Sequence, residues 1–405
     1  MRKHPSRWMA VFAVLMLILA ACSNGSGESP SGGEESQPAG SEPAESQPAE
    51  SEAPTGLAAC GDPETGEDFL IGGVTDVGQL EDKSFNEGGW CGTIAGATAV
   101  NGHAEVIVTE DPADYANNMT TFIEQGYDMI VTYGFALGNA TTIAAKENPD
   151  IGFIGLDQAV CVDEEGAPDP TFACAGDAGS LLPNYQGLIF NESQAGYLAG
   201  IVAATITESD VIGAVGGIDT IPAVVSYIGG YVNGAKSVNP DIEVLVSYVS
   251  DDITTAFNDP TTGASLAEQM IGQDADVIFQ VAGLSGQGAL EASCDADIYG
   301  IGVDTDQALA LPNLTCIVTS AEKKLVDAVS EAIQRVADGS AEGGTVLLDA
   351  SSDPPKVGVS PFHNHPDLLT DDLQSQLDDA TSAMAGGELD PCEGEGVCGP
   401  PFEQD

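Results

Sequence analysis

From residue 69 onward, short apolar runs alternate with stretches whose apolar residues recur at helical spacing. Alternation of this kind predicts parallel sheets joined by right-handed crossovers. The strand candidates are more numerous than one sheet comfortably holds, so we expect two α/β lobes. The strands are expected at 69–75, 104–109, 129–133, 152–156, 186–190, 211–215, 243–249, 277–281, 298–303 and 316–319. Helices are expected, among other places, at 115–125, 195–206, 226–238, 263–271 and 322–337.

One stretch, FLIGGVTDVGQLEDKSFNEGGW at 69–90, combines a buried strand, a turn and the start of a helix. Asp76 stands at the carboxyl end of that strand, where open α/β sheets bind their ligands. After the turn, residues 83–86 bring a cation, a hydroxyl, an aromatic ring and an amide to the start of the helix. The spacing of a phosphate-binding loop is missing. The stretch predicts a pocket for a polar, flat ligand, although Phe85 taken alone is better explained as a core residue.

Acidic residues and glycines recur at the ends of the later strands. A polar residue after an apolar run is also how strands simply stop, so each position alone is better explained as a turn. Their recurrence on the face where α/β proteins bind ligands nevertheless favours a shared site. These positions are Gly134, Asp157, Gly216, Gly217, Asp251, Asp252, Phe257, Gly283, Asp304 and Asp306.

The first 21 residues are typical of a secretory signal, with Arg2, Lys3 and Arg7 ahead of an apolar segment at 9–20. Small residues then precede Cys22, an arrangement that resembles a bacterial lipobox and implies cleavage before Cys22 and lipidation of its thiol. The alternative, an uncleaved membrane anchor, is disfavoured because the apolar run is short for a bilayer. No second long apolar run follows.

Residues 22–67 are expected to form the lipidated cysteine and a disordered acidic tether. Their Ser, Gly, Glu, Pro, Gln and Ala content offers too little apolar surface for a core. The whole chain has 64 acidic and 10 basic residues, and three of the basic ones precede Cys22. Such an excess of negative charge argues against nucleic acid and anionic lipid surfaces as partners. We attribute it to solubility or a saline habitat, not to catalysis.

Nine cysteines less Cys22 leave eight, an even number that predicts four disulfides in an exported protein. Many pairings of eight cysteines are possible, and the connectivity stays open. Zinc is the disfavoured alternative, because no CxxC spacing occurs and the four histidines are scattered. The proline-rich stretch 353–361 is typical of a loop or hinge, and the tail from residue 388 of a disulfide-pinned end. The cysteines form the sequential couples Cys60 and Cys91, Cys161 and Cys174, Cys294 and Cys316, and Cys392 and Cys398.

Several motifs together resemble the basic membrane protein family of bacterial lipoproteins. Two of them, VTDVGQLEDKSFNEGGW at 74–90 and GIGVDTDQ at 300–307, are specific in combination. The family includes purine nucleoside receptors that serve as substrate-binding subunits of ABC importers. The chain departs from the family pattern in its GLSGQG turn, its paired cysteines, its acidity and its last residues. Further matching segments are GYLAGIVAA at 196–204, IPAVVSYIGGYVNGAKSVNP at 221–240, DADVIFQVAGLSGQGALEA at 274–292 and TSAEKKLVDAV at 319–329.

The resemblance implies a type I periplasmic-binding-protein fold, in which two Rossmann-like α/β lobes with parallel sheets enclose a ligand cleft. It places the first lobe at 68–188 plus 318–345 and the second at 189–317 plus 346–405. It also implies a purine nucleoside ligand, stacked between rings from the two lobes. The implied ligand-binding residues are Asp76, Phe85, Asn86, Asp157, Phe257, Gly283, Asp304 and Lys323.

The expected protein is a monomer, held by its lipid on the extracytoplasmic face of the cell membrane, that delivers its ligand to ABC permease subunits. No cofactor and no metal are expected. One alternative is a sugar or signal-molecule receptor of the same fold that acts as a sensor. An enzyme such as a nucleosidase is disfavoured, because no nucleophile–histidine or zinc-binding motif occurs and the acids are spread along the chain.

Overall fold

The computed structural model describes residues 60–61, 63 and 66–399. The signal segment, the lipidation site Cys22 and nearly all of the expected tether lie outside the described residues. In the part of the chain that is described, no helix has both the length and the apolar character needed to cross a membrane.

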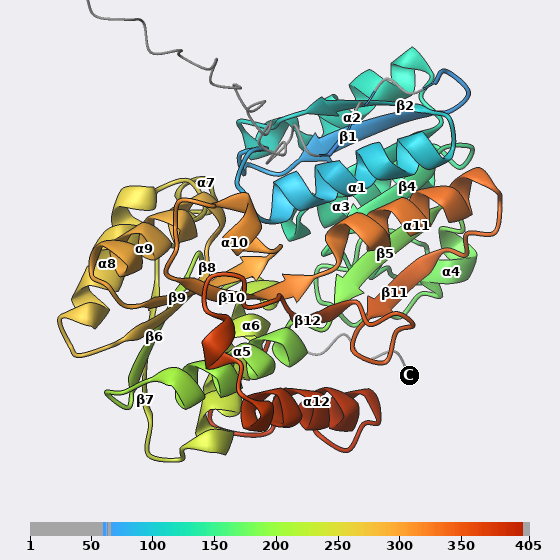
Figure 1. Ribbon diagram of the computed structural model, residues 1–405. Helices are drawn as coiled ribbons and strands as arrows, with labels where there is room; N and C mark the ends of the chain where they lie inside the picture. Colours follow the sequence, from blue (N-terminus) through green and yellow to red (C-terminus); the bar gives the residue numbers. More distant parts are fainter. Residues whose placement is uncertain (1–59, 62, 64–65, 400–405) are drawn as a thin grey trace, which may run out of the picture. The chain divides into compact units, whose positions relative to one another are not determined.

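The first lobe is built on a parallel sheet of order β11-β5-β4-β3-β1-β2. On one face, α1 (Phe85–Ala99) packs beside α11 (Leu325–Ala337), and α2 (Tyr115–Gln125) and α3 (Gly138–Glu147) lie on the other (Figure 1). Buried Trp90 and Ile333 belong to the core on the first face, and Met119 and Phe122 to a separate core on the second. The strands are β1 (Leu70–Thr75), β2 (His103–Ile107), β3 (Met129–Tyr133), β4 (Gly152–Leu156), β5 (Tyr185–Phe190) and β11 (Gly344–Leu348).

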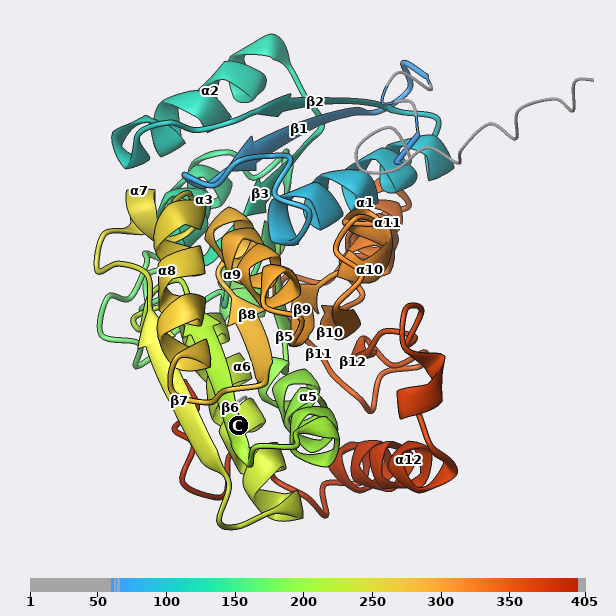
Figure 2. The same ribbon diagram turned by 60° about the vertical axis from the view of Figure 1, so that its left-hand side comes forward.

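The second lobe has a sheet of order β12-β10-β9-β8-β6-β7, parallel except for the edge strand β12. Helices α5 (Glu192–Ile206) and α6 (Pro222–Val238) pack together on one face, and α12 (Asp371–Ala385) lies against α5 (Figure 2). Helices α8 (Pro260–Ile271) and α9 (Gly283–Asp295) cover the other face. The strands are β6 (Val211–Gly216), β7 (Glu243–Tyr248), β8 (Val277–Val281), β9 (Tyr299–Asp304), β10 (Ile317–Lys323) and β12 (Val357–Val359).

Short helical segments fill several connections. They are η2 (Pro112–Asp114), η3 (Phe135–Leu137), α4 (Ala178–Leu181), α7 (Ile253–Ala256), α10 (Gln307–Ala310) and η4 (Pro366–Leu368).

The chain passes between the two sheets after β5, after β10 and after β11. The expected lobe boundaries at 188, 317 and 345 fall inside or at the start of these three strands and are therefore corrected. In particular, β10 pairs with β9 and belongs to the second lobe. An apolar run marks a strand in the sequence, but the sheet that the strand joins depends on pairing across long sequence separations.

Several expected elements have the bounds that the hydrophobic pattern gave, including β3, β4, β8 and α2. The edge strands β11 and β12 were not expected, and β12 lies in the stretch interpreted as a loop or hinge. β12 is only 3 residues long, and β11 begins with glycine and threonine and is buried only at its first and last residues, so neither shows a continuous buried apolar run. Helix α12 is mostly polar and buries only Leu373, Leu377 and Met384.

Four disulfides join the same sequential couples that the sequence analysis named. They are Cys60–Cys91, Cys161–Cys174, Cys294–Cys316 and Cys392–Cys398. Each closes a local loop within one lobe, so none crosses the cleft or opposes a movement of one lobe against the other.

Candidate ligand-binding site

A cavity with an empty volume of about 660 Å³ lies where the carboxyl ends of the two sheets face each other. All eight residues expected at the ligand line this cavity: Asp76, Phe85, Asn86 and Asp157 from the first lobe, and Phe257, Gly283, Asp304 and Lys323 from the second.

Lys323 is the centre of charge in this cavity. Its Nζ atom lies 2.5 Å from Asp157, 3.1 Å from Glu192 and 3.9 Å from Asp304. The same ammonium lies 5.1 Å from the centroid of the Phe85 ring, within cation–π range. With 3% of its surface exposed, Lys323 is a buried cation at the end of β10, directly before the chain crosses to the first lobe.

The three carboxylates decide the ionisation of Lys323. Burial alone would lower the pKa of its ammonium, but Asp157, Glu192 and Asp304 outweigh burial and hold that pKa above its usual value. For Asp304, burial raises the pKa of the carboxyl, and Lys323 opposes that rise. One cation is thus shared among three buried acids, and the cluster keeps an excess of negative charge.

Glu192 is a member of this cluster that the sequence analysis missed. It begins α5 directly after β5 and is buried, and burial raises the pKa of its carboxyl despite the neighbouring ammonium. Its position at the end of the apolar strand β5 is the signal that could have identified it. Asp157 comes from the first lobe, Asp304 from the second, and Glu192 from the crossing after β5. Through these three contacts Lys323 links both lobes and the crossing.

Asp157 and Asp304 have an unusual backbone conformation. Their φ angles are +56° and +64°, in the left-handed region that costs a residue with a side chain about 1–2 kcal/mol. Asp tolerates this region better than most residues, and such strain concentrates at functional positions. Asp157 follows directly on β4 and Asp304 is the last residue of β9, and both carboxylates lie near Lys323.

Direct hydrogen bonds cross from one lobe to the other around the cavity. Ser84 donates its hydroxyl to Asp304 Oδ2 at 2.7 Å, and Gln307 donates its amide to the carbonyl of Lys83 at 2.9 Å. On another side, Asn258 donates to the carbonyl of Val77 at 2.8 Å. These contacts hold the lobes together over the cavity, as expected for a closed arrangement.

Asp82, which sequence reasoning did not single out, organises the start of α1. Its carboxylate accepts from the backbone amides of Ser84, Asn86 and Glu87 at 2.9–3.1 Å. Burial raises the pKa of Asp82 to about 7, although these three donors oppose the rise. By capping the helix, Asp82 fixes the two residues, Phe85 and Asn86, that α1 presents to the cavity.

Two glycines make room for site side chains. At Gly134, with φ +110°, an added Cβ would stand 1.9 Å from Asp76 Oδ2. At Gly217, an added Cβ would stand 2.4 Å from the edge of the Phe257 ring. The glycines after β3 and β6 therefore leave space for the carboxylate of Asp76 and for the Phe257 ring.

Asp76, unlike Lys323, has few hydrogen-bonding or charged partners in the protein. Its carboxylate is only partly buried and accepts one backbone hydrogen bond, from Gly78 at 3.2 Å. Burial raises its pKa to about 7, and the negative charge of Asp157 adds to the rise. Near neutral pH this group is therefore divided between an acceptor form and a protonated form that can donate.

Two buried oxygens at the cavity, Asn86 Oδ1 and Asp157 Oδ1, have no hydrogen-bond partner among the described residues. We call them the open acceptors. A buried acceptor without a donor is costly, and most such groups in native proteins are satisfied. A ligand with two N–H or O–H donors in the cavity would satisfy both atoms.

In the described part of the chain, no group of three or more His, Cys, Asp or Glu side chains is placed to hold a metal ion. His363 instead pairs with Asp306 at 2.7 Å.

Residues 69–386 match the family model Bmp, described as ABC transporter substrate-binding protein PnrA-like. The chain is similar to the ABC transporter nucleoside-binding protein BmpA of Lactococcus lactis subsp. cremoris, with 30% identity over 294 residues, or 68% of this chain and 76% of that protein. It is also similar to Basic membrane protein A of Borreliella burgdorferi, with 27% identity over 324 residues, or 77% of this chain and 84% of that protein.

Among solved structures, an ABC transporter solute-binding protein from Aeropyrum pernix K1 matches with a TM-score of 0.68 and 23% identity, over 80% of this chain and 92% of that one. A solute-binding protein from Actinobacillus succinogenes 130z, with bound D-allose, matches with a TM-score of 0.56 and 15% identity, over 74% of this chain and all of that one. At these identities the likeness shows the fold, that of periplasmic solute-binding proteins.

Proposed function

Because this chain belongs to the Bmp family of PnrA-like ABC transporter substrate-binding proteins, we propose that it binds a purine nucleoside between its lobes and delivers it to a membrane permease. Family membership gives a binding role without catalysis, on the extracytoplasmic side of a transporter. The identity of the ligand and its delivery are the proposal. The relative from Lactococcus lactis that is named nucleoside-binding supports it.

One observation supports the purine most directly: the cavity takes an aromatic ring from each lobe and lies beside the two open acceptors. Phe85 comes from α1 and Phe257 from the loop after α7. Stacking of a base on an aromatic ring is worth about 1–3 kcal/mol. In this proposal the purine lies between the rings, and its N–H groups donate to Asn86 Oδ1 and Asp157 Oδ1.

The remaining lining residues suit a ribose. Asp76 and Asp304 carry carboxylates that can accept from sugar hydroxyls, and charge-assisted bonds of this kind are about twice as strong as neutral ones. Lys323 and Gly283, at the start of α9, also line the cavity from the second lobe. The acids of the cavity outnumber its one lysine, so a phosphate would meet like charge and nucleotides should be rejected.

The anchor and the movement belong to the same proposal. We expect the mature chain to begin at an acylated Cys22, and an intact mass with the diacylglycerol adduct would establish this. We expect ligand to favour the closed arrangement, because its contacts come from both lobes. Small-angle scattering should show compaction on binding, whereas identical curves at saturation would contradict the closure.

Isothermal titration calorimetry tests the ligand. We expect adenosine, guanosine or inosine to bind more tightly than free ribose and more tightly than the corresponding nucleotides. Mass spectrometry of small molecules that co-purify with the protein gives an independent identification. Tight binding of a hexose with no binding of any nucleoside would replace this proposal by the sugar-receptor alternative.

A further inference from the structure

A second cavity, with an empty volume of about 1500 Å³, lies beside the first. Phe135, Asp157 and Ala223 line both cavities. The second cavity is otherwise bounded by the crossing after β5, by the start of α6 and by the C-terminal segment 390–399. Only the three shared residues thus mark the border between the two spaces.

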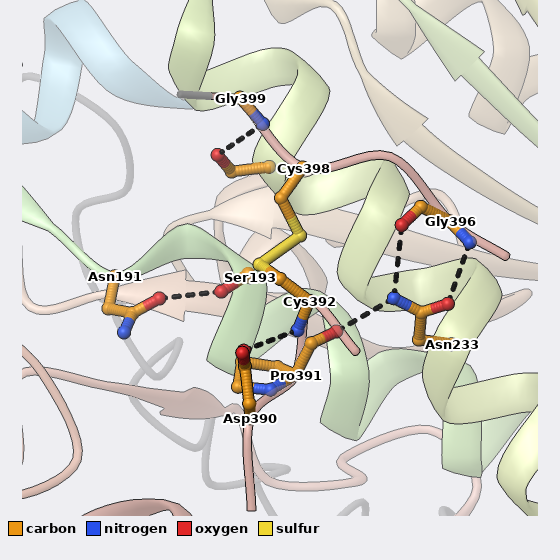
Figure 3. Close-up of a disulfide and its surroundings, with 10 residues drawn as sticks. Asn191, Ser193, Asn233, Asp390, Pro391, Cys392, Gly396, Cys398 and Gly399 are labelled. Carbon is orange, nitrogen blue, oxygen red and sulfur yellow. Dashed lines mark hydrogen bonds between the residues drawn. A yellow bond between two sulfur atoms is a disulfide. The ribbon is translucent and has the colours of Figure 1, made fainter. Parts of the chain in front are cut away.

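The C-terminal segment forms a fixed wall of the second cavity (Figure 3). The side-chain amide of Asn233 on α6 donates to the carbonyls of Pro391 and Gly396, and its oxygen accepts from the amide of Gly396 at 2.7 Å. The Cys392–Cys398 disulfide closes the loop between these anchor points. Beyond it, the Gly399 amide donates to the hydroxyl of Ser226 at 3.2 Å. These bonds hold the segment against α6.

The lining of the second cavity has a definite chemistry. Leu347 and Val397 give it exposed apolar surface, whereas Ile189 and Phe190 are almost fully buried. Asn191, Ser193 and Ser226 add polar groups to the lining. Its charged lining residues are Asp157, Glu192 and Asp390, and no Lys or Arg is among the described residues that line it. A space of this kind accepts an apolar group that is neutral or cationic, and it disfavours an anion.

The border between the cavities contains one of the open acceptors. Asp157 is 8% exposed; its Oδ2 is held by Lys323, while its Oδ1 has no partner in the described ranges. Phe135 stands beside it, stacked on Phe172 with ring centroids 6.3 Å apart. Because Asp157 lines both cavities, a purine nitrogen that donates to Asp157 Oδ1 lies at their border, and a second substituent on that nitrogen lies next to the second cavity.

We infer that the ligand site extends into the second cavity and accepts purine nucleosides whose exocyclic amine carries an uncharged or cationic apolar substituent. The inference rests on the proposed function, because it uses the purine edge at Asp157. An exocyclic amine has two hydrogens, so one can be donated to Asp157 Oδ1 while the other is replaced. The substituent then contacts the apolar wall made by Phe135, Leu347 and Val397.

Calorimetry on the full chain in detergent, with adenosine and with adenosine benzylated on the exocyclic amine, tests this inference. We expect the two affinities to agree within about tenfold, and a carboxylate on the benzyl ring to weaken binding by about tenfold or more. If adenosine binds and the benzylated form binds about a hundredfold more weakly, the extension is wrong and the proposed function stands. If no nucleoside binds, the proposed function fails and the extension fails with it.

A variant that fills the second cavity with a larger side chain makes the test more specific. Leu347 lies on the edge strand β11, lines only the second cavity and is 48% exposed, so Leu347→Trp adds an indole without disturbing a packed core. We expect it to weaken binding of benzylated adenosine by about tenfold or more and to leave adenosine binding unchanged. Val397 is also exposed and lines only the second cavity, and Val397→Trp should act in the same way.

Val246→Trp is the matched control, because Val246 is similarly exposed, on β7, and lines neither cavity. It should change neither affinity. If Leu347→Trp and Val397→Trp leave the ratio of the two affinities as it is in the unmodified chain, the substituent does not enter the second cavity and the inference is overturned.

Discussion

The two ends of the ligand cavity differ in how many partners the protein supplies to their buried polar groups. Around Lys323, three carboxylates from three connections share one cation, and Ser84 and Tyr227 add hydroxyls near Asp304. Around Asp76 and Asn86, one carboxylate has a single backbone donor and one amide oxygen is an open acceptor. At the first end the protein supplies a cation and hydroxyl donors to the carboxylates, whereas at the second end the carboxylate has one backbone donor and the amide oxygen has none among the described residues.

This difference separates residues that contribute to folding stability from residues that are available mainly to a ligand. Changes near Lys323 should affect both folding and binding, because a charge left without its partner is costly in a buried place. Changes at Asp76 should affect folding little and can even stabilise the protein. Asp157 belongs to both ends, since one of its oxygens is held by Lys323 and the other is an open acceptor.

The largest effect is expected for Lys323→Met. It leaves Asp157, Glu192 and Asp304 buried without their cation, and breaking a buried ion pair in this way typically costs about 3–5 kcal/mol. Urea denaturation followed by circular dichroism measures the loss. Lys236→Met is the control, because Lys236 is a partly exposed lysine 3.9 Å from the exposed Glu395. Equal stabilities for the two variants would remove the distinction between the ends of the cavity.

Asp304→Asn should weaken nucleoside binding. The substitution keeps the shape of the side chain but removes a charged acceptor, and loss of one charge-assisted bond costs about 1.5–3 kcal/mol. This corresponds to roughly a ten- to hundredfold loss of affinity in calorimetry. Asp306→Asn is the neighbouring control, because Asp306 pairs with His363 and does not line the ligand cavity. Unchanged nucleoside binding by Asp304→Asn would remove Asp304 from the proposed ribose site.

Phe257→Ala should remove one stacking face and cost about 1–3 kcal/mol of binding free energy. The loss should be seen with a nucleoside and be small with free ribose, because only the base stacks. Ile143→Ala, which removes an exposed apolar side chain on α3 outside the cavity lining, should leave both affinities unchanged. A similar loss for ribose and nucleoside would show that Phe257 shapes the cavity without stacking on a base.

The smallest effect is expected from Asp76→Asn, and it depends on pH. Burial raises the folded-state pKa of Asp76 from 3.8 to about 7, so the folded protein holds a proton that the unfolded chain has already lost. Asp76 therefore reduces stability progressively as pH rises from about 4 to 7, and the reduction is complete above that range.

Removing this carboxyl should stabilise the protein at pH 8 relative to pH 4. We expect about 1 kcal/mol, less than the shift alone implies, because Asp76 keeps some contact with solvent. The measurement is the difference in unfolding free energy between Asp76→Asn and the unmodified chain at each pH, which cancels the contribution of the other acids. A difference that does not vary with pH would contradict the assignment.

Much of the fold follows from local pattern. Apolar runs such as 129–133 and 277–281 are long and continuous enough to mark buried strands, and their alternation with helices implies parallel sheets. The position of acids and glycines directly after these runs favoured a shared site, because the carboxyl ends of parallel strands meet on one face, and the family resemblance named the eight residues expected there. The even number of cysteines predicted disulfides in the same way, from composition alone.

Other features depend on contacts between distant parts of the chain. Nothing in the local sequence assigns β10 to the second sheet, because that choice is made by pairing with β9. Glu192 became a site residue only when folding placed it 3.1 Å from Lys323, which is 131 positions away in the sequence. The second cavity likewise exists because Asn233 holds the C-terminal segment against α6. Periodicity and composition are local properties, whereas charge sharing, strand order and cavities arise from proximity that only the folded chain creates.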